Sequence, residues 1–127
     1  MTATPTYFGT PWCPSGTISA ANTNRNGTGT IVSLGLAPAG GGRIDDIIIT
    51  AQGTTTAGFV RIFKYDGTTY RLFDEIAVAA ITPSSTVAAW RYAAFNLGIT
   101  LAAGESLGFS TEKAETFNIV VTRGGTI

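Results

Sequence analysis

Carboxyl groups are the side chains that could perform acid–base chemistry in this sequence, because none of its 127 residues is histidine. Histidine is the commonest general acid or base, the usual partner of a nucleophilic serine or cysteine, and the commonest metal ligand. The close carboxyl pairs are Asp45–Asp46, Asp74–Glu75 and Glu112 with Glu115. Adjacent residues of a strand point to opposite faces, so the first two pairs cannot readily face one substrate. We therefore predict no catalytic residues and no enzyme, although a fold can still unite distant carboxylates.

Metal and cofactor sites have no clear pattern in the sequence. Acidic residues and loop carbonyls could bind calcium, but no segment has the spaced acidic pattern of a dedicated loop. The glycine-rich stretches 40–42 and 53–58 each precede a predicted strand, whereas a phosphate-binding loop needs a helix directly after its glycines. Cys13 is the single cysteine and cannot form an intrachain disulfide. We predict no metal and no cofactor.

The composition excludes several classes of partner. Charged residues make up 13% of the chain, against about 25% in an average soluble protein. Eight basic and eight acidic residues are scattered along it, so we expect no basic patch for nucleic acid or anionic lipid. No apolar run approaches the roughly 20 residues that span a bilayer, and we expect no signal peptide. A surface so neutral is either built from Thr, Ser, Asn and Gly or partly covered by neighbouring subunits, and we expect both.

The sequence after Gly29 predicts an all-β domain. Short runs of β-branched and aromatic residues alternate with turn residues, at spacings typical of sandwiches and barrels. We predict an antiparallel β-sandwich over residues 30–127. Its expected strands cover residues 30–36, 43–52, 58–65, 69–76, 90–97, 106–111 and 117–122.

Two of these strands are apolar on both faces. In 58–65, aromatic groups alternate with aliphatic ones, which predicts a strand covered on both sides. Asp66-Gly67 after it predicts a two-residue type I′ hairpin turn. In 43–52, Ile47 and Ile49 share one face, and Ile44 and Ile48 are expected on the other. That strand would then be central in the fold or covered by a subunit interface.

Residues 1–29 form a different kind of segment. Three prolines prevent a helix or an inner strand from running through it: Pro5, Pro11 and Pro14. We predict an extended N-terminal arm. Its aromatic residues Tyr7, Phe8 and Trp12 are costly to leave in water, so we expect them to dock on the chain's own body or on a neighbour, with a flexible terminus as the alternative. These three are the predicted partner-binding residues.

Several segments resemble small structural proteins encoded among the head and tail genes of tailed bacteriophages. They are 53–58 (GTTTAG), 65–72 (YDGTTYRL), 81–84 (ITPS) and 101–107 (LAAGESL) followed by 110–118 (STEKAETFN). Residues 101–107 are also similar to the turn and strand that precede the last strands of jelly-roll trimers, where glycine permits the tight turn. The resemblance covers roughly residues 41–121. It implies a jelly-roll-like β-sandwich in a capsid decoration, head-fibre or tail position, often homotrimeric, and no catalytic residues.

These observations lead to one functional hypothesis and two alternatives. The first is a capsid decoration (cement) protein, made in the host cytoplasm, which forms a homotrimer on the capsid surface and clamps the major capsid protein or other virion proteins. The second is a head or tail fibre module that recognises a host-surface glycan through exposed aromatic residues such as Tyr70, Trp90 or Tyr92. The third is a minor virion enzyme with a carboxylate pair assembled by the fold.

Overall fold

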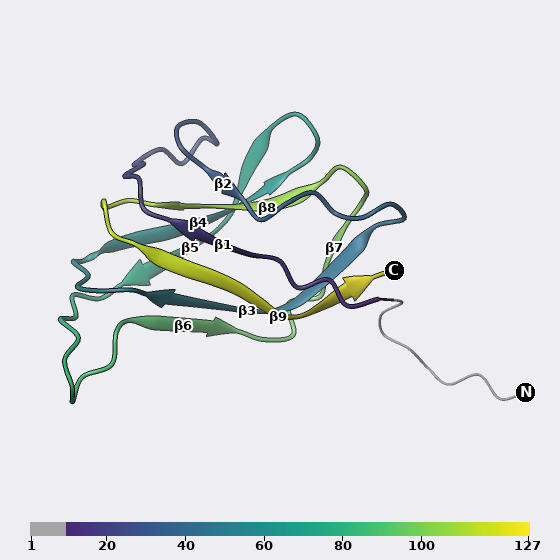
Figure 1. Cartoon of the computed structure of the whole chain (residues 1–127). Helices are drawn as coiled ribbons and strands as arrows, with labels where there is room; N and C mark the ends of the chain where they lie inside the picture. The colour runs from purple at the N-terminus through teal and green to yellow at the C-terminus, as the bar shows by residue number, and fades with distance from the viewer. Residues whose placement is uncertain (1–9) are drawn as a thin grey trace, which may run out of the picture.

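Two antiparallel β-sheets packed face to face form the fold of residues 10–127, the part of the chain that the computed structural model describes (Figure 1). The strands are β1 (Ser15–Ile18), β2 (Val32–Ser33), β3 (Gly42–Ala51), β4 (Gly58–Tyr65), β5 (Tyr70–Val78), β6 (Arg91–Ala94), β7 (Ile99–Leu101), β8 (Ser106–Thr111) and β9 (Phe117–Thr126). Sheet A has the order β1-β9-β3-β6, with β7 also paired to β3, and sheet B has the order β2-β8-β4-β5. The predicted all-β sandwich is confirmed. In the described region no helix is long and apolar enough to cross a membrane.

The strand pairing is jelly-roll-like. β1 pairs with β9, β2 with β8, β3 with β6 and β4 with β5, all antiparallel. The chain thus follows the path of one long hairpin that has been wrapped so that successive strand pairs alternate between the two sheets. The two antiparallel sheets confirm the predicted β-sandwich, and the hairpin between β4 and β5 lies at one edge of sheet B.

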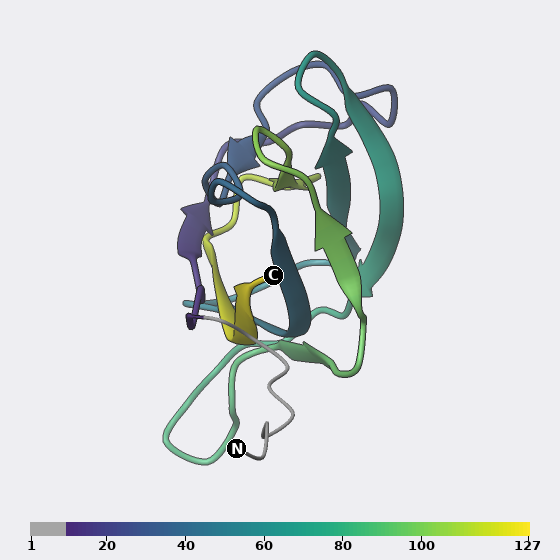
Figure 2. The same ribbon diagram turned by 90° about the vertical axis from the view of Figure 1, so that its right-hand side faces the viewer.

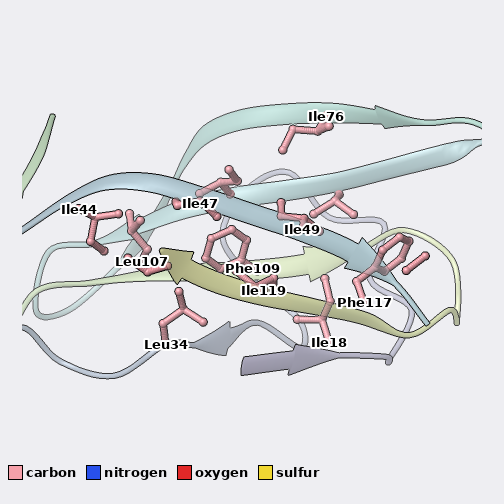
Figure 3. Close-up of a cluster of buried hydrophobic side chains, with 14 of the residues drawn as sticks. Ile18, Leu34, Ile44, Ile47, Ile49, Ile76, Leu107, Phe109, Phe117 and Ile119 are labelled. Atoms are coloured by element: carbon pink, nitrogen blue, oxygen red, sulfur yellow. The ribbon is translucent and has the colours of Figure 1, made fainter. Parts of the chain in front are cut away.

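The hydrophobic core lies between the two sheets (Figure 3). Alternate residues of the central strands point into it, and their side chains are almost completely buried. The labelled members are Ile18, Leu34, Ile44, Ile47, Ile49, Ile76, Leu107, Phe109, Phe117 and Ile119. Trp90 joins them with its ring edge-to-face on Phe117, at 5.6 Å between ring centroids.

A β-bulge in β3 corrects the predicted faces of that strand. Ile44 pairs with Gly124 and Asp46 with Arg123, so Asp45 is an extra residue on this strand. The extra residue shifts the alternation by one position. Ile44 therefore lies in the core on the same side as Ile47 and Ile49, and not on the opposite face.

The β4–β5 hairpin also differs from the prediction. Tyr65 pairs with Tyr70, so four residues form the loop in place of the two expected. Gly67 has a positive φ of 100° and Asp66 does not, which excludes a type I′ turn. Asp66 instead caps the loop, because its Oδ1 accepts hydrogen bonds from the backbone N–H groups of Thr68 and Thr69 at 3.0 and 2.8 Å. The hydrogen bond from Thr69 and, to a smaller extent, that from Thr68 lower the pKa of Asp66.

The predicted strand limits are confirmed for β4 and β8 and within a few residues for β3, β5 and β9. β2 is much shorter than the predicted strand 30–36, and β6 is shorter than 90–97. The sequence prediction missed β1 and the three-residue β7. β1 pairs with β9, so the sandwich includes residues on the N-terminal side of the predicted boundary at residues 29–30.

Residues 19–31, which we call the cover segment, lie on the face of sheet B that points away from sheet A (Figure 1). Asn22 is buried and anchors the segment: its N–H donates to Thr111 O at 2.8 Å, and its Nδ2 donates to the carbonyls of Thr28 and Thr30 at 3.0 Å. Beneath it, Arg61 and Phe63 of β4 are fully buried. The prediction that β4 is covered on both sides is confirmed, and the outer cover is a segment of the same chain.

Gly108 of β8 provides the space for this cover. A Cβ at this position would lie 2.6 Å from Ile31 of the cover segment and 2.6 Å from the ring of Tyr70. Neither group can move freely, because both are packed against the outer face of sheet B. Glycine is required here for the close approach of the two side chains.

We expect Gly108→Ala to destabilise the protein by about 1–3 kcal/mol, the usual cost of overpacking. Gly53→Ala is the matched control, because nothing lies within 4 Å of the added Cβ and the backbone there is ordinary. Urea unfolding of both variants measures the difference. Equal stability of the two variants would contradict the tight packing of the cover segment on sheet B.

Candidate interaction surface

The β3 bulge gives Asp45 and Asp46 separate partners. The Oδ1 of Asp45 accepts a hydrogen bond from Arg43 Nε at 2.9 Å. Asp46 lies 3.4 Å from Arg123 Nε and accepts the N–H of Asn96 at 3.0 Å. Both carboxyl groups are thus used in local ion pairs and are not directed at a common point, as the sequence predicted.

The other carboxyl pairs are separated in the same way. Glu75 faces Arg61 across sheet B, whereas Asp74 pairs with Ile62 on the opposite face. Glu115 accepts hydrogen bonds from the N–H and Oγ1 of Thr56 at 2.7 and 2.8 Å. Within residues 10–127, no group of three or more His, Cys, Asp or Glu side chains could hold a metal ion. That the chain is not an enzyme stays a prediction.

A buried ion pair lies under the cover segment. Arg61 is 1% exposed, and its Nε donates to Glu75 Oε1 at 2.8 Å, while its Nη1 donates to Asn22 O at 3.3 Å. Arg25 of the cover segment pairs with the same carboxylate oxygen. The hydrogen bond from Arg61 and, to a smaller extent, that from Arg25 lower the pKa of Glu75. This cluster joins the cover segment to β4 and β5.

Trp12 contacts its own body. Its N–H donates to Gly124 O at 3.0 Å, and its ring packs on the core beside Gly42, where an added Cβ would lie 2.7 Å from two ring atoms. The sequence left open whether Trp12 docks on the chain's own body or on a neighbour, and the structure shows it on the chain's own body. Tyr7 and Phe8 lie outside the described residues, and the partner-binding role of all three stays a prediction.

The aromatic residues of the glycan-binding alternative do not form an exposed patch. Trp90 is 7% exposed and belongs to the core. Tyr92 is partly buried against the same core. Tyr70 packs its ring against Tyr65 and Phe63, at 4.8 and 6.5 Å between centroids. The glycan-binding alternative expected these aromatic residues to be exposed, and the structure does not support that expectation.

The exposed large apolar side chains of the described region lie partly on strands and partly in the loops that connect them. Leu72 and Phe73, 40% and 50% exposed, are neighbours on β5, the edge strand of sheet B. The other large ones are Leu36, Val87, Phe95, Val120 and Ile127. Sequence reasoning missed β5 as a surface, because an apolar pair inside a predicted strand is usually assigned to the core. Its position at a sheet edge is a property of the topology.

Comparison with known proteins gives two structural neighbours. No protein-family model matches the chain, and no curated protein matches it. Two solved structures do, both of a pentameric capsid protein isolated from metagenomic phage sequences, with TM-scores of 0.44 and 0.41 and 13% sequence identity. Each match covers 86% of this chain and 60% of the neighbour, so the chain spans less than two thirds of the length of these proteins.

We expect Glu75→Gln to lower the folding stability at neutral pH and to weaken the dependence of that stability on pH in the acid range. The folded-state pKa of Glu75 lies below the unfolded value, which is about 4.3. Ionised Glu75 therefore stabilises the fold above that pH, and this contribution disappears as the pH falls through the folded-state pKa. The variant should be less stable at neutral pH, because buried Arg61 loses its counter-charge, and should approach the wild type in acid.

Urea midpoints measured from neutral pH into the acid range test this expectation. Glu112→Gln is the matched control: it makes the same chemical change at a side chain that takes part in no ion pair within residues 10–127. A gap between Glu75→Gln and wild type that is constant with pH would show that the ion pair does not hold the cover segment.

Proposed function

We propose that this chain is a structural protein of a tailed-phage virion, and more specifically a capsid decoration protein that assembles as a homotrimer. The observation that carries the proposal is a jelly-roll-like sandwich over the segments that resemble phage head and tail proteins. Because a fold alone does not define a function, the surface is the second support. It is poor in charge, and it exposes apolar groups in loops and on the edge strand β5 that a neighbouring subunit can cover.

The proposed mechanism is a multivalent clamp on the capsid surface. Each subunit of the trimer makes modest contacts with the major capsid protein, and linking three sets of contacts raises the overall affinity when all can engage together. A protein that binds the assembled shell and not its dissociated subunits stabilises the shell by mass action.

The first described residues, 10–12, contact the C-terminal part of β9. Thr126 N–H donates to Thr10 O, and Thr10 N–H donates to Thr126 Oγ1, both at 2.8 Å. Pro11 forms a bridge with Gly125, and Trp12 is packed on the core. Residues 10–18 are thus held along β9 by the chain's own body. In our proposal, Tyr7 and Phe8 are left as the arm residues that contact the capsid.

The variant Tyr7→Ala/Phe8→Ala tests the arm. We expect its binding to undecorated capsids to weaken about tenfold or more, as for truncation of two aromatic anchors. Its urea unfolding should not change. Thr4→Ala/Thr6→Ala is the matched control, because it truncates two polar side chains of the same segment. Trp12→Ala should instead lower the stability of the isolated chain.

Three outcomes would count against the proposal at different levels. Full capsid occupancy by Tyr7→Ala/Phe8→Ala would contradict the arm assignment alone. A wild-type chain whose native mass is not a multiple of three chains would contradict the stoichiometry. Failure of the wild-type chain to bind the undecorated capsid of its own phage would contradict decoration.

A further inference from the structure

The free edge of β5 is the longest open strand edge in the described region. The outer strands of the two sheets are β1, β6 and the three-residue β7 in sheet A and β2 and β5 in sheet B. β5 has nine residues, whereas β1 and β6 have four each and β2 has two. It contains no proline and forms the outer margin of the molecule in Figure 2. Such an edge presents unpaired backbone N–H and C=O groups to another strand.

A second β-bulge determines how the side chains of this edge are arranged. Leu72 pairs with Phe63 of β4 and Asp74 pairs with Ile62, so Phe73 is the extra residue. In a regular strand, two residues three positions apart point to opposite faces. The extra residue cancels that difference, and Arg71 and Asp74 therefore lie on the same face of sheet B.

The four residues 71–74 stay exposed, while the cover segment holds both ends of the run. Gly27 approaches the carbonyl of Tyr70, and Arg25 pairs with Glu75. Between these contacts, Leu72 and Phe73 are 40% and 50% exposed. The exposed stretch thus carries an apolar pair, and the cover segment holds the strand at both ends of that stretch.

The charges at the two ends of this stretch match those of a second copy that runs antiparallel to it. The run reads Arg71-Leu72-Phe73-Asp74, positive at one end and negative at the other. Charges on an edge strand usually prevent further pairing. In an antiparallel pairing of two identical copies, however, each end meets the opposite end, so opposite charges face each other and stabilise the contact.

We propose that β5 pairs with β5 of a second copy of this chain, antiparallel, about a two-fold axis between Leu72 and Phe73. Arg71 of each copy then faces Asp74 of the other, and the four apolar side chains meet at the centre. The contact is isologous, since the same residues contribute from both sides. Arg71 is free for it, because its ion pair with Asp66, at 3.3 Å, is exposed to water and weak.

This contact does not depend on the proposed capsid function, because the isolated chain can form it. A two-fold contact also adds to the three-fold contact of a trimer and does not replace it. If both exist, β5 joins two trimers into a hexamer. If the three-fold contact is absent, the isolated chain is a dimer.

A charge exchange tests the pairing, with the native mass from sedimentation equilibrium as the measurement. The wild-type mass should be an even multiple of the 13.1 kDa chain. Arg71→Glu and Asp74→Arg should each halve it, because like charges then face each other. The double variant Arg71→Glu/Asp74→Arg is self-complementary again and should regain the wild-type mass. Arg91→Glu, which reverses an exposed charge on the edge strand β6, should leave the mass unchanged.

Several results would overturn the proposal. One is a wild-type chain that stays monomeric, or purely trimeric, up to about 1 mM protein, the limit of a weak specific association. Another is a mass that neither single reversal changes. A double variant that stays at half mass while its thermal unfolding matches the wild type would exclude the antiparallel register. A purely trimeric wild-type chain would overturn this contact and leave the proposed function intact, whereas a wild-type chain that fails to bind its capsid would leave this contact intact, so the two proposals can fail separately.

Discussion

The structure depends on covering both faces of β4. One face of this strand packs into the core between the sheets, and the other carries Arg61 and Phe63, which would be exposed in a plain two-layer sandwich. Burying a guanidinium group is costly unless its charge and its hydrogen bonds are satisfied. Glu75, the carbonyl of Asn22 and the ring of Phe59, 5.5 Å away, meet that requirement. The cover segment therefore has to be in place for sheet B to be stable.

The cover segment also reduces the number of charged groups that the described surface offers to a partner. With Arg61, Arg25 and Glu75 paired within the chain, few charges remain free to act on a partner, and the chain is poor in charge from the start. The described surface therefore offers neutral polar groups, strand edges and isolated apolar side chains. Such a surface suits association with other protein subunits better than it suits binding of nucleic acid or acidic substrates.

Much of the fold could be predicted from the sequence, because alternation and turn residues are local signals. β4 and β8 have the predicted limits, and the two-sided burial of β4 was visible in its apolar pattern. The identity of its outer cover was not visible, since residues 19–31 are mostly polar and show no apolar alternation. β1 was missed because prolines directly before an edge strand resemble an irregular arm. Trp12 was recognised as an anchor, and its attachment to its own body depends on the small size of Gly42, a distant contact.

The β-bulges at Asp45 and Phe73 show why the candidate surface was harder to predict than the fold. Each adds one residue that alternation cannot reveal, and each changes which side chains share a face. In β3 the extra residue moves Ile44 into the core and gives Asp45 and Asp46 different partners. In β5 it aligns Arg71 with Asp74 beside an exposed apolar pair. A single inserted residue thus separates the groups that could have formed an acid pair, and in the other sheet aligns groups that can recognise a second copy.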